Sequence, residues 1–93
     1  MLIRPSTRKA KKWMAEFQDG TVTHFGAKGY SDYTLGASEA QRAAYIRRHA
    51  HEDQRDPRSA AALSRYILWG DSRDMLSNIR AFKKRHSTAL LRK

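Results

Sequence analysis

Hydrophobic and polar residues alternate on either side of Asp19-Gly20, and this pattern predicts a β-hairpin. Before the turn, Trp13, Ala15 and Phe17 share one face, and after it Phe25 falls on the same face. The Asp-Gly dipeptide accepts positive φ at both central positions of a two-residue turn. Because two strands alone are marginal in water, we expect helices to cover this aromatic face.

A connector rich in glycine and tyrosine follows the hairpin over residues 26–37. We expect Tyr30, Tyr33 and Leu35 to pack against the core and to order it. Lys28 stands in the segment Gly26-Ala-Lys-Gly29, which could suggest a phosphate cradle. No helix N-terminus follows immediately, so we interpret these glycines as turn residues.

Ser38 and Gln41 have the spacing of a capping box, which predicts a first helix from about Glu39 to His51. Asp56-Pro57 predicts the start of a second helix, with aspartate as the cap and proline as the first helical residue. We expect this helix to end at Trp69.

The second helix carries an apolar stripe that includes Leu63 and Ile67. Gly70 would take the left-handed conformation just beyond its end. A third helix is expected after Asp71 or Ser72, extending to about Arg85. Its buried stripe is expected to comprise Leu76, Ile79 and Phe82.

These elements predict an α+β fold, in which an N-terminal β-hairpin packs against about three α-helices. Leu, Ile, Val and Phe together number only 15 of the 93 residues, and the formal net charge is +10. Such a composition is typical of disordered chains. The nine aromatic residues argue for a fold, because each can bury a large area.

The positive charge lies mainly at the two ends of the chain. Residues 1–12 carry a charge of +5, residues 80–93 carry +6, and residues 13–79 carry −1. We therefore expect residues 1–11 to form a basic N-terminal arm, residues 12–86 a single compact domain, and residues 87–93 a basic C-terminal tail. Residues 1–10 and 87–93 are expected to be mobile until they dock.

Motifs for catalysis and metal binding are poor. The absence of cysteine excludes disulfides, thiolate metal cages and a cysteine nucleophile. The run His49-Ala-His-Glu-Asp53 superficially resembles a metal site, but we interpret it as a solvated helix end. No serine has an evident base and orienting group. We expect neither an enzyme nor a cofactor nor a metal site, and no apolar stretch is long enough to span a membrane.

The basic residues instead predict contact with a polyanion, and we expect DNA or RNA. Arginine and lysine pair well with phosphate oxygens and would bind without strong base sequence preference. The residues that we expect to bind phosphates are Arg4, Arg8, Lys9, Lys11, Lys12, Arg42, Arg47, Arg48, Lys83, Lys84 and Arg85.

Four blocks of the sequence together resemble a small family of proteins encoded by large double-stranded DNA viruses of algae and amoebae. The blocks begin at Phe25 (FGAKGYSDYT), Arg42 (RAAYIRRH), Asp56 (DPRSAAALSRYILWG) and Asn78 (NIRAFKKR). The resemblance covers roughly residues 12–86. The resemblance implies a compact α+β domain in a viral setting. The family has no established activity from which site residues of this chain could be inferred.

Two functional hypotheses follow. In the first, the protein binds nucleic acid as a virion or nucleoprotein component. In the second, it is a minor structural, capsid-type protein that bridges other subunits, and its basic ends contact acidic protein surfaces. Both place the protein inside the host cell, in the cytoplasm or nucleus, and in the virion, and neither makes it a secreted protein.

Overall fold

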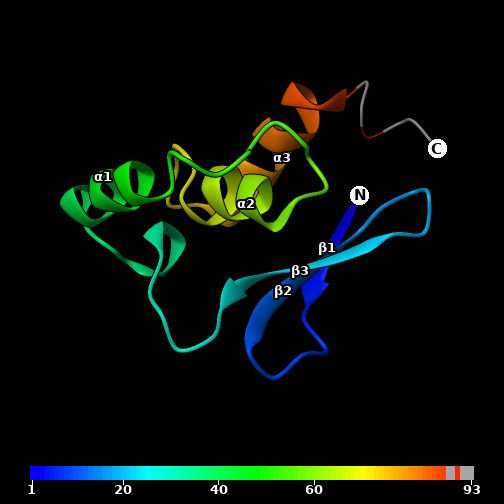
Figure 1. Ribbon diagram of the computed structural model, residues 1–93, viewed down its shortest axis with the longest axis horizontal. Helices are drawn as coiled ribbons and strands as arrows, with labels where there is room; N and C mark the ends of the chain where they lie inside the picture. Colours follow the sequence, from blue (N-terminus) through cyan, green and yellow to red (C-terminus); the bar gives the residue numbers. More distant parts are fainter. Residues whose placement is uncertain (88–89, 91–93) are drawn as a thin grey trace.

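Three antiparallel strands form one sheet, and the helices lie to one side of it (Figure 1). The computed structural model describes residues 1–87 and Leu90. The strands are β1 (Leu2–Pro5), β2 (Lys11–Glu16) and β3 (Val22–Ala27), in the order β1-β2-β3. The helices are α1 (Glu39–Arg48), α2 (Ala60–Leu63) and α3 (Met75–Arg85), with a π-helical turn, η2 (Ser64–Leu68), after α2. The predicted α+β class is confirmed.

The pairing of β2 with β3 confirms the predicted aromatic face. Trp13 lies opposite Phe25, and Ala15 lies opposite Thr23. Phe25 and Ala15 are fully buried, and Trp13 packs at the margin of the core. The alternation of the two strands therefore places these rings beneath the helices.

The predicted two-residue turn of this hairpin is wrong. Gly20 N donates to Phe17 O, and Phe17 N donates to Thr21 O, so the loop contains three residues. Gly20 has a φ of 89°, whereas Asp19 lies outside the positive-φ region. The Asp19 carboxylate accepts hydrogen bonds from both Thr21 N and Thr21 Oγ1, which stabilises the longer loop.

The N-terminal segment differs from the expected mobile arm. Leu2–Pro5 pair with β2 as the third strand, with Ile3 opposite Ala15. Ile3 packs against the core, and Arg4 forms an ion pair with Glu16. The apolar contact and the neutralised charge explain why this segment joins the sheet.

The C-terminal segment also differs from the expected tail at one position. Leu90 is buried in the core, although we expected residues 87–93 to be mobile. Its amide donates to His86 O at 2.9 Å. Residues 88, 89 and 91–93, including Arg92 and Lys93 of the expected basic tail, lie outside the part that the structure describes.

The connector packs through Tyr33 alone of the three expected side chains. Tyr33 is buried and begins a 3-10 turn, η1 (Tyr33–Leu35), which Asp32 caps. Tyr30 is 72% exposed and Leu35 is 63% exposed, so their predicted packing is wrong. The short turn points only one of these side chains inward.

The capping box that Ser38 and Gln41 form at the start of α1 is confirmed. The helix ends at Arg48, earlier than the predicted His51. Ala50 N donates to Arg47 O, and this tighter bond closes the last turn.

The second helix begins later than predicted. Asp56 forms a local turn, because its carbonyl accepts from Ser59 N and its carboxylate accepts from Arg58 N. Ser59 then caps α2, and its side chain accepts from Ala62 N. The carboxylate of Asp56 is therefore engaged in this turn and does not cap a helix that begins at Pro57.

Gly70 does not adopt the predicted left-handed conformation. A Cβ there would lie 2.4 Å from Tyr66 O and 2.7 Å from Asn78 Cγ. Position 70 therefore requires glycine, because a larger side chain has no space there. The π-helical turn before it ends with a hydrogen bond from Trp69 N to Ser64 O.

The third helix begins at Met75 because the Asp74 side chain accepts from Ser77 N, in place of the predicted caps Asp71 and Ser72. Phe82 is fully buried as expected, whereas Leu76 is 62% exposed. Met75, next to it in the first turn, packs against the core instead. The largest fully buried apolar side chains of the core come from β3, α2, η2 and α3: Phe25, Leu63, Ile67, Leu68 and Phe82.

Candidate nucleic-acid interface

The structure divides the eleven expected phosphate-binding residues into two groups. Four of them already have partners within the protein. Arg4 pairs with Glu16, and Arg85 lies over the Tyr66 ring at 4.3 Å from its centre. The other two, Lys12 and Arg42, hold separate parts of the fold together.

Lys12 on β2 forms an ion pair with Asp32, which precedes η1. The Nζ–Oδ2 distance is 2.7 Å, and Asp32 is only 1% exposed. The other carboxylate oxygen accepts hydrogen bonds from Thr34 N and Thr34 Oγ1. Lys12 therefore neutralises a buried charge, and its expected role as a phosphate ligand does not fit this position.

Arg42 connects α1 to the chain after η2. Its Nε donates to Trp69 O and Gly70 O at 3.2 and 2.9 Å, and its Nη2 lies 2.9 Å from Asp71 Oδ1. The guanidinium also lies over the Tyr33 ring. These contacts satisfy carbonyls that the π-helical turn leaves without helical partners. Arg42 is a structural residue of the fold.

The other seven expected side chains make no hydrogen bond or ion pair with any residue in the range 1–87 or with Leu90. They occur at three places: the β1–β2 turn, the end of α1 and the end of α3. In chain order they are Arg8, Lys9, Lys11, Arg47, Arg48, Lys83 and Lys84.

A fourth cation joins the group at the β1–β2 turn. Lys28 N donates to Ala10 O at 2.9 Å, and Lys11 pairs with Ala27 across the ladder. Lys28 therefore lies at the same end of the sheet as Lys9 and Lys11, and its side chain likewise has no partner in the described structure. We name Arg8, Lys9, Lys11 and Lys28 the turn cluster.

Sequence reasoning missed Lys28. The signal was present, because this lysine stands between Gly26 and Gly29 in the segment that could suggest a phosphate cradle. The sheet register, which places the connector beside the β1–β2 turn, supplies the missing information.

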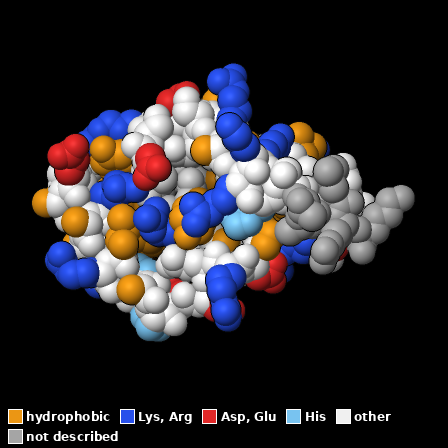
Figure 2. Space-filling view, turned by 90° about the horizontal axis from the view of Figure 1, so that it is seen from above, with side chains coloured by type: hydrophobic (Ala, Val, Ile, Leu, Met, Phe, Trp, Pro, Cys, Tyr) orange, Lys and Arg blue, Asp and Glu red, His pale blue; other side chains and the backbone are white. Residues whose placement is uncertain are grey.

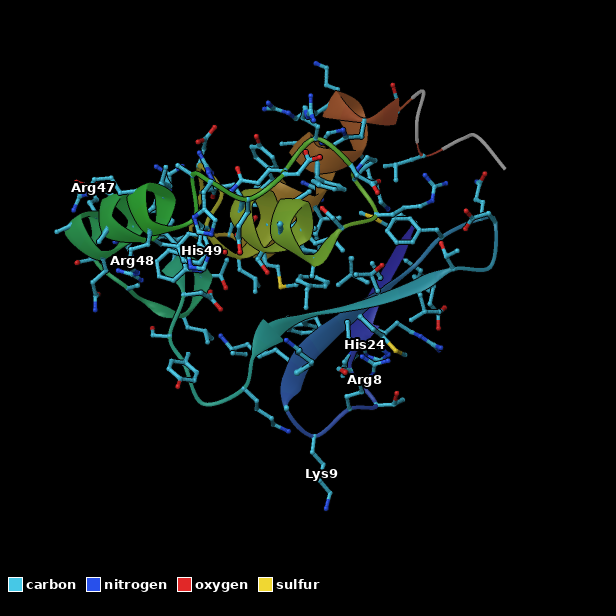
Figure 3. The ribbon with its side chains drawn as sticks, viewed as in Figure 1. Arg8, Lys9, His24, Arg47, Arg48 and His49 are labelled. Carbon is cyan, nitrogen blue, oxygen red and sulfur yellow. The ribbon has the colours of Figure 1, made fainter. Side chains whose placement is uncertain are left out.

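Hydrogen bonds give the β1–β2 turn a defined shape. Ser6 Oγ lies 2.7 Å from His24 Nδ1 on β3 and accepts a hydrogen bond from Arg8 N at 3.0 Å. Lys11 N donates to Arg8 O. In Figure 3, Arg8 and His24 lie close together at this end of the sheet, and Lys9 points away from the protein. The turn therefore carries two exposed cations, Arg8 and Lys9, on an ordered backbone.

The remaining cations lie apart from the turn cluster. Arg47 and Arg48 are in the last turn of α1, at the left of Figure 3. Lys83 and Lys84 are in the last turn of α3, which Figure 1 places at the top, opposite the β1–β2 turn. Figure 2 shows lysine and arginine in separate groups on the face seen from above. The structure thus does not bring all the expected residues to one surface.

A cleft of about 600 Å³ lies between the end of the sheet and the helices. Its lining includes Lys11 from β2, Tyr30 from the connector, Arg48 from α1 and Ala60 from α2. Phe25 and Leu68 contribute apolar surface. The cleft therefore joins the turn cluster, through Lys11, to the cationic end of α1, through Arg48.

Three stacked rings form part of the lining. Tyr45 lies between Trp69, at a centre-to-centre distance of 4.5 Å, and His49, at 4.1 Å. His49 Nδ1 also lies 2.9 Å from Glu52 Oε1. Burial, followed by the nearby Glu52 charge, raises the pKa of Tyr45, so its phenol is neutral at physiological pH.

The cleft is lined by charged, aromatic and small side chains. Within residues 1–87 and Leu90, no three or more histidine, aspartate or glutamate side chains gather as metal ligands. Asp53, in the run that superficially resembled a metal site, instead pairs with Arg55. The Arg55 hydrogen bonds lower the pKa of Asp53. The described side chains of the lining offer cations, aromatic rings and hydroxyls beside the carboxylates of Asp32 and Glu52.

The fold and these surfaces define a small α+β protein with exposed cations at the ends of its elements. Its chain belongs to a family of unknown function (DUF5754), whose model matches residues 1–49. The match includes the sheet, the connector and α1. No curated protein and no solved structure matches the chain. The viral setting that the four sequence blocks implied stays a prediction.

None of the helices in the described part of the chain has both the length and the apolar character that crossing a membrane requires.

Proposed function

We propose that this protein binds nucleic acid through the phosphates, without strong base sequence preference. The observation that carries the proposal is the turn cluster. Its four cations come from two separate stretches of the sequence, meet at one end of the sheet, and have no acidic partner within the described residues. Unpaired cations on an ordered backbone can each take a phosphate without first breaking an internal ion pair.

The contrast with the paired cations supports this proposal. Arg4, Lys12 and Arg42 face carboxylates, while the cations of the turn cluster and of the α1 end do not. Each phosphate contact releases condensed counterions, so affinity should fall steeply as salt is raised. In the viral setting that the sequence resemblance implies, such a protein would be a virion or nucleoprotein component.

The test is a titration of the full chain against a labelled duplex and a labelled single strand at about 50 and about 200 mM salt. We expect micromolar binding at the lower concentration and a steep loss at the higher one. If neither the duplex nor the single strand binds at the lower salt concentration, the proposal is refuted. Salt-independent binding would also contradict it, because phosphate contacts would then not supply the affinity.

An alternative proposal is a minor structural protein that bridges other subunits. One observation favours it: Leu2 and Val22 flank Glu16 across the sheet and are both exposed. Apolar side chains in such a row could contact a protein neighbour. This alternative predicts that Leu2→Ser and Val22→Ser abolish assembly with that neighbour and leave nucleic-acid affinity unchanged.

A further inference from the structure

The cleft beside the turn cluster has the size of a small-molecule site. Its volume of about 600 Å³ lies within the range of roughly 300–1,000 Å³ that is usual for ligand pockets. At Gly26, the sheet comes so close to η2 that a Cβ would lie 2.7 Å from Leu68 Cδ1. This close approach closes one side of the cleft with apolar atoms.

The rings of the cleft suit a flat, aromatic ligand. Trp69, Tyr45 and His49 form the stack described above and all line the cleft. Tyr30 lines it as well, yet this side chain is 72% exposed. An exposed ring at the opening of an apolar cleft offers a face on which a nucleobase can stack.

The charges of the cleft suit a ligand that carries phosphate. Two carboxylates line it: Asp32 pairs with Lys12, and Glu52 Oε1 lies 2.9 Å from His49 Nδ1, a contact that neutralises the carboxylate only when the imidazole is protonated. Lys11 and Arg48 also line the cleft, and their side chains have no hydrogen-bond or ion-pair partner in the described part of the chain. Lys11, Lys12 and Arg48 outnumber Asp32 and Glu52, so the lining has a formal net charge of +1.

We propose that the cleft holds one unpaired nucleobase of a single-stranded nucleic acid, stacked on Tyr30, with the adjoining phosphates at Lys11 and Arg48. The proposal rests on the proposed function and deepens it, because it names the form of nucleic acid. The bases of a duplex are stacked and paired inside the helix, so only a single strand or a flipped base can enter. The protein then prefers single strands to duplexes of equal length.

The experiment compares three probes: oligo(dT) of about 12 nucleotides, an abasic strand of the same length, and a duplex of that length. All are titrated by fluorescence anisotropy with the full chain at one low salt concentration. We expect oligo(dT) to bind about tenfold more tightly than the abasic strand, since stacking is the only difference between them.

Variants assign the difference to the cleft. Tyr30→Ala should weaken oligo(dT) binding about tenfold and leave duplex binding unchanged, while Tyr30→Phe retains the ring and the affinity. Leu35→Ala is the matched control, because Leu35 is similarly exposed on the same connector and does not line the cleft. Ala60→Trp, at an exposed position of the lining, should fill the cleft and reproduce the loss.

Each outcome distinguishes the inference from the proposed function. If no probe binds, the proposed function fails. If the abasic strand and oligo(dT) bind equally, or if Tyr30→Ala behaves like Leu35→Ala, the cleft holds no base and phosphate binding still stands. If polyglutamate of equal charge displaces oligo(dT) from the wild-type protein as well as unlabelled oligo(dT) does, the cleft is an acidic-peptide site and the inference is overturned.

Discussion

Lys12 Nζ lies 2.7 Å from Asp32 Oδ2, and this ion pair joins the central strand β2 to the connector. Both side chains are largely shielded from solvent. Replacing Lys12 with Met should lower the free energy of unfolding by about 3 kcal/mol, because it leaves a buried carboxylate without compensation. Urea unfolding measures the change. Adding Asp32→Asn to Lys12→Met should recover part of the loss.

Lys11 provides the matched control for that variant. Lys11→Met removes the same charge one residue earlier, where the side chain has no partner in the described structure. We expect unchanged stability and weaker nucleic-acid binding. If Lys12→Met instead keeps its stability and loses affinity, then Lys12 is a phosphate ligand and the ion pair is dispensable.

Gly70 should tolerate no side chain. The Cβ of Gly70→Ala would collide with Tyr66 O and with Asn78, whose amide donates to Ile67 O and Ser72 O. We expect a loss of about 3 kcal/mol, because both packing and a buried hydrogen-bond network are disturbed.

Gly20→Ala is the comparison for Gly70→Ala. There is open space around Gly20, but its φ is 89°. The strained backbone alone should cost about 1–2 kcal/mol. Thermal unfolding of both variants decides the point, and an equal or smaller loss for Gly70→Ala would show that the surrounding atoms move aside.

His86 should make the fold sensitive to mild acid. Burial, followed by the charge of Arg85, lowers the pKa of His86 from its ordinary value of 6.5. Its Nε2 is buried without a hydrogen-bond partner in the described structure, and its ring packs at 4.7 Å from Phe82. Because the unfolded chain binds the proton more readily, stability is full above pH 6.5 and falls as the pH drops below it.

The measurement is the unfolding midpoint in urea between about pH 7.5 and about pH 5, for the wild type and for His86→Phe. The variant should lose this part of the pH dependence. Parallel curves for the two proteins would assign the acid sensitivity to other groups. His24, which lies 2.7 Å from Ser6 Oγ, provides a second histidine for comparison through His24→Gln.

The turn cluster should determine the salt dependence of binding. Lys9→Gln removes an unpaired cation and should reduce the slope of log affinity against log salt on duplex DNA by about 0.9. Arg4→Gln removes the same charge from a residue that already pairs with Glu16, and should leave the slope nearly unchanged. Equal effects of the two variants would show that net charge alone governs binding.

Local patterns predicted the parts of the fold that neighbouring residues determine. The alternation around Phe25 placed the correct faces, and the spacing of Ser38 and Gln41 marked the start of α1. Strand β1 was missed because its four residues include arginine and proline and become a strand only by pairing with β2. Leu76 matched a helical stripe, but the first turn of α3 packs Met75, partly buried, against the core instead and leaves Leu76 exposed.

The candidate site was also predictable only where neighbouring residues in the sequence determine it. Charge counting identified Arg8, Lys9 and Lys11, but it could not separate them from Lys12, whose acidic partner lies 20 residues further along the chain. It also gave no weight to Lys28, which reaches the same place through the sheet register. The cleft joins residues from the sheet, the connector and the helices, so no local motif could reveal it.

Strand β1 has only four residues and ends in Pro5, which has no amide hydrogen to offer an incoming strand. At the other margin of the sheet, Thr23 Oγ1 on β3 donates to Arg58 O, which ties the loop before α2 to that strand. A proline and a tethered loop at the two margins of a sheet disfavour the edge-to-edge pairing of copies from which cross-β fibrils grow.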